Sequence, residues 1–384
     1  IKNKKVRKRL NRLMEEYKHL EPRAMKEKMD MFVKAQIMRK CEHSPYESQC
    51  FLVPKKIQGE YRFVSNFITI NRITERDQWP LPVIQDLLKT LSVKKYFSKL
   101  DLKGGFYHVA IKEADRHKTA VVTPWGLYEY CRMAMGLTNS PAVFQRAMQR
   151  VFGDIPGVEI YLDDILIATP DEQTDLATIE AVLKRASEYN CRFVLWKCEF
   201  FKSELEYLGH CISAEGVGPS PSYVKKVLKL ERPKSKKGLQ EICGSLQWLN
   251  KFDLRIGDVL VPFSDALKKG VLFEWNDEME KSWKRLRSLV KNLKLLDHPD
   301  QTQPFVLYTD ASDRAMGACL MQLQDGRYVP IEYLSKKFTP AERKWPTCEQ
   351  ELFALVTAIR KWRPYLIMRH FEAFTDHKNL ECLF

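Results

Sequence analysis

The chain has 384 residues, of which 45% are hydrophobic and 11% aromatic, and its formal net charge at pH 7 is +14. This composition excludes a disordered or fibrous protein and allows two or more domains with cores of their own. No apolar run approaches the ~18 residues of a membrane span, and the first residues lack the apolar stretch of a signal peptide. We therefore expect a soluble intracellular protein without a membrane partner.

The positive charge is concentrated in two short stretches. Residues 1–40 hold 14 Lys and Arg against 5 Asp and Glu, and residues 225–237 hold seven bases against one acid. Each stretch alone is also explained by a solvated helix face, and the first one has an amphipathic helical period. Two such stretches in one chain favour a polyanionic partner, because each neutralised phosphate releases counterions. Charge alone therefore favours nucleic acid as the partner.

Strands and helices are predicted in alternation along the first half of the chain. The predicted strands cover residues 49–56 and 61–71, around a turn, and residues 95–101, ending at Asp101. Helices are predicted over residues 79–91, 138–152 and 176–190, the second with Ser140 as its cap and Pro141 in its first turn. Between the last two helices, residues 159–168 ("EIYLDDILIA") have the alternation of a strand or hairpin.

Two linkers divide the second half of the chain. We place the first at "GVGPSPS" (216–222) and the second at "DHPDQTQP" (297–304). The residues between them are helical and basic, and after them strands return together with one long helix over residues 347–362. The sequence therefore divides into a basic helical segment (1–44), a first catalytic region (45–215), a helical region (216–300) and a second catalytic region (301–384).

Asp163 and Asp164 lie at the centre of a run that is otherwise apolar. An unpaired carboxylate removed from water costs several kcal/mol, so the two acids need either solvent, as in a solvated turn, or a cation. Asp101 supplies a third acid, since it ends an apolar strand and precedes two glycines that allow a close backbone approach. Magnesium prefers oxygen ligands and shares them with phosphates, and two such ions can clamp an in-line phosphoryl displacement. Because strand side chains alternate, we expect Asp163 to be the firmer ligand alongside Asp101.

A second set of acids lies near the end of the chain. Asp310 and Asp376 follow predicted strands, and the helix between them carries Glu349 and Glu351. Strand-end acids and a helical glutamate can hold two magnesium ions around a scissile phosphate. Periodicity does not choose between the two glutamates, because both flank the apolar stripe of the helix. Taken singly, each of these acids is also explained as a surface carboxylate.

Eight motifs occur in a fixed order: "FSKLDLKGGFYHVAI", "MAMGLTNSPAVFQRAM", "IYLDDILIA", "LWKCEF", "YLGH", "YTDAS", "EQELFAL" and "FTDH". The first five resemble the palm motifs of reverse transcriptases, most closely those of gypsy-like LTR retrotransposons. The last three resemble the attached ribonuclease H domain. The resemblance covers roughly residues 45–384 and rests on ordered motifs, which makes chance agreement negligible.

This resemblance implies an α+β fold, with the fingers and palm of a right-hand polymerase over 45–215, thumb and connection over 216–300, and a partial ribonuclease H-like domain over 301–384. It implies RNA-directed and DNA-directed DNA synthesis by two-metal nucleotidyl transfer, with Mg²⁺, or Mn²⁺ as an alternative. The implied partners are template with primer, RNA–DNA hybrid and deoxynucleoside triphosphates, and also a second copy of the chain or an integrase. The implied location is the cytoplasm, within retrotransposon particles, with nuclear entry as a further option.

The family also places a fourth ribonuclease H acid beyond residue 384. We therefore leave ribonuclease H activity of this chain open, and expect the chain to be a piece of a longer polyprotein. A nucleic-acid-binding subunit without catalysis is the rival interpretation. An RNA-templated RNA polymerase is disfavoured, because a ring at Phe106 would clash with a 2′-hydroxyl.

Roles for individual residues also follow from the resemblance. The metal ligands and catalytic acids are Asp101, Asp163 and Asp164 for the polymerase and Asp310, Glu351 and Asp376 for the ribonuclease H. The residues expected around the nucleotide are Lys55 and Arg62 at the triphosphate, Phe106 under the sugar, Met135 in place of a bulky aromatic, and Lys197 near the leaving pyrophosphate. The residues expected at the primer end are Tyr207, Leu208, Gly209 and His210. A solvated turn lysine stays the alternative for Lys55, and core packing the alternative for Phe106.

Overall fold

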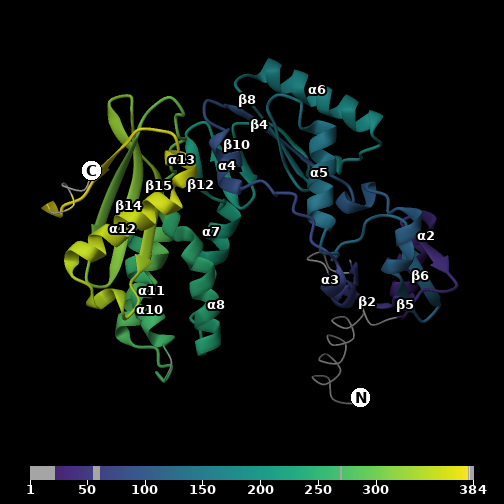
Figure 1. Ribbon diagram of the computed structural model, residues 1–384, viewed down its shortest axis with the longest axis horizontal. Helices are drawn as coiled ribbons and strands as arrows, with labels where there is room; N and C mark the ends of the chain where they lie inside the picture. The colour runs from purple at the N-terminus through teal and green to yellow at the C-terminus, as the bar shows by residue number, and fades with distance from the viewer. Residues whose placement is uncertain (1–21, 55–60, 269, 379, 381–384) are drawn as a thin grey trace, which may run out of the picture. The chain divides into compact units, whose positions relative to one another are not determined.

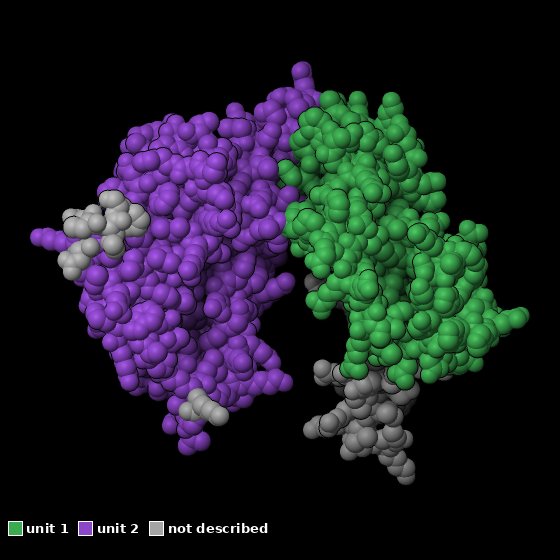
Figure 2. All heavy atoms as spheres, viewed as in Figure 1, with its two compact units in different colours: residues 1–82, 99–167, 176–199 green, residues 83–98, 168–175, 200–384 purple. Residues whose placement is uncertain are grey.

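The computed structural model describes residues 22–54, 61–268, 270–378 and 380. The chain forms two compact units, each built from several segments of the sequence (Figure 2). The first unit comprises Ile1–Pro82, Lys99–Ile167 and Leu176–Glu199, and the second comprises Val83–Ser98, Ala168–Asp175 and Phe200–Phe384. Lys55 and the predicted basic helix at residues 1–21 lie outside the described residues.

A five-stranded sheet in the order β1-β6-β5-β2-β3 belongs to the first unit (Figure 1). Its strands are β1 (Met38–Cys41), β2 (Ser48–Pro54), β3 (Tyr61–Ser65), β5 (Val121–Thr123) and β6 (Gly126–Tyr130). Neighbouring strands are antiparallel, except that β2 and β5 are parallel. The helix α2 (Pro22–Lys34) packs on this sheet, because Met29 and Phe32 on its apolar stripe join Leu52 and Phe63 in one buried core.

The strand predicted over residues 61–71 is too long. It ends at Ser65, and the short helix α3 (Ile68–Ile73) follows. The side-chain oxygen of Asn66 accepts a hydrogen bond from the Ile68 N–H at 3.2 Å, which turns the backbone away from the sheet. The apolar alternation in the sequence continues past this turn because Phe67 is buried, and for this reason the predicted strand was too long.

The second sheet of this region has the order β7-β8-β4-β9. Its strands are β4 (Tyr96–Asp101), β7 (Val158–Tyr161), β8 (Asp164–Thr169) and β9 (Glu199–Lys202), and the chain passes from one unit to the other within β4, β8 and β9. The predicted helices form as α5 (Ser140–Phe152) and α6 (Glu172–Glu188). Pro141 is in the first turn of α5 as predicted, but Ser140 is not its cap, because the Ser140 hydroxyl donates to the Ala134 carbonyl at 2.8 Å.

The first predicted linker is a strand instead. A three-stranded antiparallel sheet contains β10 (Glu204–Tyr207), β11 (His210–Ser213) and β12 (Gly216–Pro219). The N–H and the carbonyl of Val217 pair with Leu296 at 2.8 and 2.9 Å, so the backbones of the two segments touch. A Cβ at Gly216 would lie 2.3 Å from the Leu296 carbonyl oxygen. The glycines are therefore found where two backbones approach closely within a sheet. A strand of this kind has the same glycine-rich composition as a linker.

The middle of the second unit is helical, as predicted. Its helices are α7 (Pro221–Leu228), α8 (Lys236–Gln247), α9 (Arg255–Val259), α10 (Val261–Ala266) and α11 (Asp277–Lys291), with the 3₁₀ turn η5 (Trp248–Lys251) after α8. Side chains of Ser220, Ser235 and Asn276 cap α7, α8 and α11 by accepting backbone N–H groups. The helices enclose one apolar core that includes Leu246, Trp283 and Phe263.

A four-stranded sheet in the order β15-β14-β13-β16 ends the second unit. Its strands are β13 (Phe305–Ala311), β14 (Ala315–Gln324), β15 (Arg327–Lys337) and β16 (Phe371–Phe374), of which β13 and β16 are parallel and the other pairs antiparallel. The helix α12 (Thr347–Lys361) lies against this sheet (Figure 1), because Ala354, Leu355 and Ala358 share its core with the strands. The short helix α13 (Arg363–Leu366) then leads to β16.

The other short elements are α4 (Ile84–Lys89) and the 3₁₀ turns η2 (Gly105–His108), η3 (Glu113–Thr119), η4 (Leu195–Lys197) and η6 (Glu342–Lys344). In the described part of the chain, none of the helices combines the length and the apolar character required to cross a membrane.

Candidate active sites

The two adjacent acids lie at the tip of a hairpin in the first unit. Strands β7 and β8 pair antiparallel with Tyr161 opposite Asp164, which leaves Leu162 and Asp163 as a two-residue turn. Leu162 has a φ of 55°, in the left-handed region that a residue with a Cβ rarely adopts. Asp163 is exposed and Asp164 is partly buried. The predicted hairpin with acids at its tip is therefore present.

The side chain of Gln145 makes two hydrogen bonds to the backbone of this hairpin. It is fully buried on α5, and its side-chain oxygen accepts the Leu162 N–H at 2.7 Å while its side-chain nitrogen donates to the Ile160 carbonyl at 2.9 Å. The sequence analysis missed this residue. The one available sign was a glutamine on the buried face of an amphipathic helix, where an amide needs partners.

Replacing Gln145 by Met is expected to destabilise the first unit by about 1–3 kcal/mol, because a backbone N–H and a carbonyl of the turn lose their buried partners. Unfolding in urea measures this loss. The matched control is Gln149→Met, one helical turn further along α5 on an exposed position. Equal stability of the two variants would contradict the role given to Gln145.

Asp101 ends β4 next to this turn. The N–H of Leu102, the following residue, points at the Asp163 carbonyl at 3.4 Å. Gly105 comes close to the same acid, since a Cβ placed on it would lie 3.5 Å from the Asp163 Cβ. Its φ of 25° adds a backbone constraint. Gly105 therefore lets the chain pass beside the acidic turn, whereas the close approach of a ligand expected at the two glycines stays a prediction.

The charges of Asp163 and Asp101 affect the pKa of Asp164. The pKa of Asp164 is raised above its ordinary value, mainly by burial and then by the neighbouring charge of Asp163, and Asp101 raises it further. Lys197 lies 3.3 Å from both carboxylate oxygens of Asp101. The site therefore contains a cation, in the form of an ammonium group, at one of the three carboxylates. This ammonium occupies a place at which a divalent ion could bind.

The other residues expected around a nucleotide lie on neighbouring segments of the first unit. Phe106 is partly buried on η2 and packs edge-on against Phe144, with ring centroids 5.1 Å apart. Burial raises the pKa of Tyr107 on η2 to about 12, and the charge of Arg62 on β3 opposes that rise. Met135 is 36% exposed. The Phe106 ring thus has a packing partner and keeps exposed surface, which fits both interpretations weighed for it.

The four residues expected at the primer end form the tip of the β10–β11 hairpin in the second unit. Tyr207 pairs with His210, and Leu208 and Gly209 between them both have positive φ, 48° and 81°, as in a type I′ turn. A Cβ at Gly209 would meet nothing within 4 Å. Tyr207 and His210 are buried, whereas the turn between them is open. Gly209 at this turn is therefore accessible to solvent.

The second set of acids forms a compact group in the second unit. One carboxylate oxygen from each of Asp310, Glu351 and Asp376 lies within 4.8 Å of the others. In the described part of the chain this is the one group of three such residues with that spacing, so Asp101, Asp163 and Asp164 are farther apart. Asp310 is at the penultimate position of β13 rather than at its end, and Asp376 lies two residues past β16.

Burial distinguishes the two glutamates that periodicity left open. Glu351 is 2% exposed and one of its oxygens accepts the Ala311 N–H at 2.9 Å, whereas Glu349 is exposed. The other oxygen of Glu351 is buried and has no hydrogen-bond partner among the described residues. Burial raises the pKa of Glu351, and Asp376 and Asp310 raise it further. Such a carboxylate, beside two more, fits a divalent cation.

Two regions of the chain match known protein families. Residues 53–212 match the reverse transcriptase (RNA-dependent DNA polymerase) family, and residues 275–373 match the RNase H-like domain found in reverse transcriptase. The chain therefore belongs to the reverse transcriptases and carries the RNase H-like domain found with them.

Curated relatives narrow this class. The chain is 31% identical over 364 residues to the transposon Tf2-3 and Tf2-7 polyproteins of Schizosaccharomyces pombe, which covers 93% of this chain and 27% of each relative. The chain thus spans about a quarter of the length of these relatives. The predicted family, the reverse transcriptase and ribonuclease H region of an LTR retrotransposon polyprotein, is confirmed.

Solved structures agree in fold. A foamy viral protease-reverse transcriptase in complex with dsDNA gives a TM-score of 0.84 at 24% identity, over 94% of this chain and 75% of that one. The same kind of protein in complex with an RNA/DNA hybrid gives 0.83 at 23% identity, over 94% and 49%. The predicted fold class, an α+β right-hand polymerase followed by a ribonuclease H-like domain, is confirmed.

Proposed function

We propose that this chain is an RNA-directed and DNA-directed DNA polymerase with an associated ribonuclease H. The observation that carries the proposal is the acidic turn of Asp163 and Asp164 beside Asp101, within the residues that match reverse transcriptases. Template with primer, RNA–DNA hybrid and deoxynucleoside triphosphates are the proposed partners. In support, the names of the foamy viral relatives describe complexes with dsDNA and with an RNA/DNA hybrid.

In the proposed reaction, the primer 3′-hydroxyl loses its proton to solvent and its oxygen forms a bond to the α-phosphorus of the nucleotide. The bond from the α-phosphorus to the oxygen that bridges to the β-phosphorus breaks, and pyrophosphate leaves. Asp101, Asp163 and Asp164 would hold Mg²⁺, with Mn²⁺ as an alternative, and such ions when bound stabilise both the attacking and the leaving oxygens. The chain's own cations have separate tasks. Arg62 binds the triphosphate, and Lys197, once released from Asp101, neutralises the leaving pyrophosphate.

Asp310, Glu351 and Asp376 are proposed to perform hydrolysis of the RNA strand in a hybrid. A water molecule loses a proton as its oxygen bonds to the scissile phosphorus, the bond to the 3′-oxygen of the preceding ribose breaks, and that oxygen takes up a proton from solvent to become a 3′-hydroxyl. Glu351 is the ligand that burial holds in place, and the two exposed aspartates are free to adjust to the substrate. Their mutual repulsion in the absence of a cation favours binding of one.

The setting and the finer divisions of the chain are also proposals. We place the enzyme within retrotransposon particles, in the cytoplasm with access to the nucleus, because its curated relatives are transposon polyproteins. A second copy of the chain or an integrase is a proposed partner in these particles. Fingers and palm over 45–215, thumb and connection over 216–300, and a ribonuclease H-like domain over 301–384 are the proposed subdivisions.

Primer extension on RNA and DNA templates tests the proposal. With Mg²⁺ and deoxynucleotides, the native chain should extend a primer on both templates. Binding of primer–template that weakens with salt, without any synthesis, would support the rival interpretation of a nucleic-acid-binding subunit. That result would refute the proposed polymerase.

Phe106→Ala is expected to admit ribonucleotides, because its ring would no longer clash with the 2′-hydroxyl. The preference for deoxynucleotides, measured as the ratio of kcat/KM values, should fall roughly 10- to 200-fold. The control is Phe51→Ala, an exposed aromatic of the same unit on β2. If the sugar preference is unchanged, Phe106 is a packing residue only.

A further inference from the structure

The carbonyl groups of the primer turn, Leu208 and Gly209, are both held by the protein. The Leu208 carbonyl contacts Nδ1 of His210 at 3.1 Å, and the Gly209 carbonyl accepts the Ser220 N–H at 3.1 Å. A carbonyl can only accept, so Nδ1 of His210 must carry the proton in the first of these bonds. The positive φ of Leu208 makes this anchor necessary, since a residue with a Cβ is strained there.

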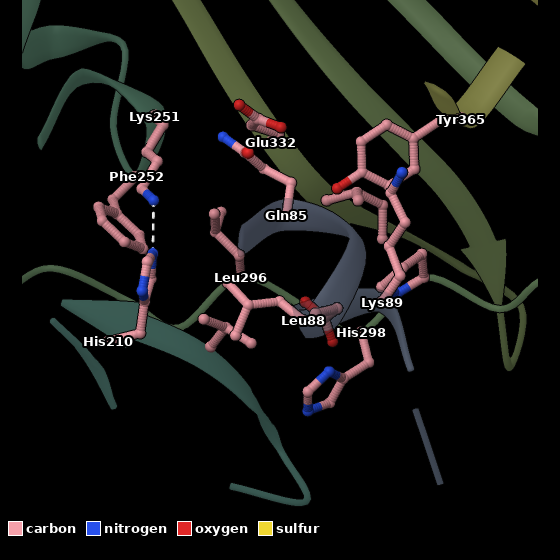
Figure 3. Close-up of a pocket in the computed structure, with 14 residues that line it drawn as sticks. Gln85, Leu88, Lys89, His210, Lys251, Phe252, Leu296, His298, Glu332 and Tyr365 are labelled. Carbon is pink, nitrogen blue, oxygen red and sulfur yellow. Dashed lines mark hydrogen bonds between the residues drawn. The ribbon is translucent and has the colours of Figure 1, made fainter. Parts of the chain in front are cut away.

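Lys251 determines which nitrogen of His210 carries the proton. Its Nζ lies 2.6 Å from Nε2 of His210, and this contact is drawn as the dashed line in Figure 3. An ammonium can only donate, so Nε2 must be unprotonated and the ring neutral. Trp248 and Phe252 enclose the pair, with the ammonium 4.5 and 4.9 Å from their ring centroids. Lys251 is at the end of η5, 41 residues away from the turn along the chain.

We propose that Lys251 is a positioning residue for primer extension: by donating to Nε2 it holds His210 as the neutral Nδ1–H form, which in turn fixes the Leu208 carbonyl and the turn that holds the primer end. This inference rests on the proposed function of the turn. Nothing in the sequence motif "YLGH" points to Lys251, because the contact exists only in the folded unit.

The surrounding charges favour the same arrangement. Figure 3 shows the cavity next to His210, which is lined by the charged and titratable groups Lys89 on α4, Lys251 on η5, His298 before β13, Glu332 on β15 and Tyr365 on α13. Asp297 also lines this cavity, and Lys361 on α12 pairs with Glu332 at 3.6 Å. Burial and then the charge of Lys251 lower the pKa of His210 to about 4. Burial lowers the pKa of Lys251 to about 8, although Glu332 opposes that shift. At neutral pH the pair is therefore Lys⁺ and neutral His.

Lys251→Met removes both the donor and the charge. Without that donor Nε2 of the ring has no partner, so the tautomer is no longer fixed. The pKa of His210 also rises part of the way toward its ordinary value, since burial still lowers it, and the ring takes up more proton at low pH than in the native chain. We expect the KM for primer–template to rise roughly tenfold at pH 7 and further at pH 6, with kcat less affected, while the native chain, whose Lys251 stays charged over this range, shows little change. Lys89→Met is the matched control, because Lys89 lines the same cavity but pairs with Asp86 at 2.6 Å.

His210→Asn gives a second, independent variant. Its amide keeps an N–H near the position of Nδ1 and does not titrate, so its KM should be independent of pH between 6 and 7, with or without Lys251. If Lys251→Met has the same KM and pH profile as Lys89→Met, the proposal is overturned. A pH dependence that persists in His210→Asn upon loss of Lys251 overturns it as well.

Nitrogen NMR of His-labelled protein separates this inference from the proposed function. The native chain should show Nδ1 protonated and Nε2 unprotonated for His210 at pH 7, whether or not it synthesises DNA. Finding the opposite tautomer, or a form that Lys251→Met leaves unchanged, would contradict the inference even in an active polymerase. Absence of synthesis by a native chain with the expected tautomer would contradict only the proposed function.

Discussion

Asp163→Asn is expected to lower primer extension roughly a thousandfold, because it removes one charged ligand from a site where bound cations contribute several kcal/mol and each 1.36 kcal/mol is a factor of ten. Stability should change little, since Asp163 is exposed at the turn and its backbone is held by other residues. Initial rates of single-nucleotide incorporation, measured with saturating Mg²⁺, give the comparison. Thermal unfolding of the same samples establishes that the fold is intact.

A matched control for this variant is Asp154→Asn. Asp154 is an exposed aspartate of the same unit whose carboxylate pairs with Arg185 at 2.9 Å, and it has no proposed role in catalysis. Its incorporation rate should stay close to that of the native chain. Retention of native rates by Asp163→Asn would remove the main support for the polymerase assignment.

Glu351→Gln is expected to lower the rate of RNA hydrolysis in an RNA–DNA hybrid roughly a hundred- to a thousandfold, while primer extension continues. The same change should raise the Tm of the protein without divalent ions at pH 7. Folding raises the pKa of Glu351, so its ionised form costs stability at every pH above the unfolded value, and a neutral amide removes that cost. The stabilisation should disappear as the pH falls below about 4.5, where the unfolded carboxyl is also protonated.

Addition of Mg²⁺ should reverse the order of the two melting temperatures. Ions that bind the native state stabilise it, and the native chain keeps the buried ligand that the variant lacks. Glu349→Gln, two residues away on an exposed position of α12, is the control and should match the native chain in cleavage and in Tm. If Glu349→Gln lost cleavage instead, the choice between the two glutamates would be wrong.

Local patterns predicted the elements that carry the candidate sites. Apolar alternation around Asp163 and Asp164 indicated a hairpin, and the hairpin is present. This prediction succeeded because the determining interactions lie within a few residues. The strand predicted over residues 61–71 was too long for the opposite reason, since the burial of Phe67 after Ser65 depends on core residues that are distant in sequence. The approach of a ligand expected at the two glycines after Asp101 stays a prediction.

Long-range contacts account for what the sequence did not reveal. Gln145 and Lys251 are ordinary residues on helical segments until folding brings them to the backbone of Leu162 and the ring of His210. The glycines of β12 look like a linker because a close approach to Leu296 has the same requirement for small residues as a flexible segment. Composition cannot separate these cases, because both place glycine where a side chain would be unfavourable.

The ion pair between Lys197 and Asp101 has a consequence for the effect of ionic strength. A divalent cation that binds at Asp101 displaces the ammonium group of Lys197, which is already paired there. Binding therefore brings two positive charges to Asp101 and removes one. Monovalent salt screens the departing lysine as well as the arriving ion, because both interactions are exposed to solvent. Cation occupancy at Asp101 should therefore vary less with added KCl than at Asp310, Glu351 and Asp376, which form no ion pair with a lysine in the described part of the chain.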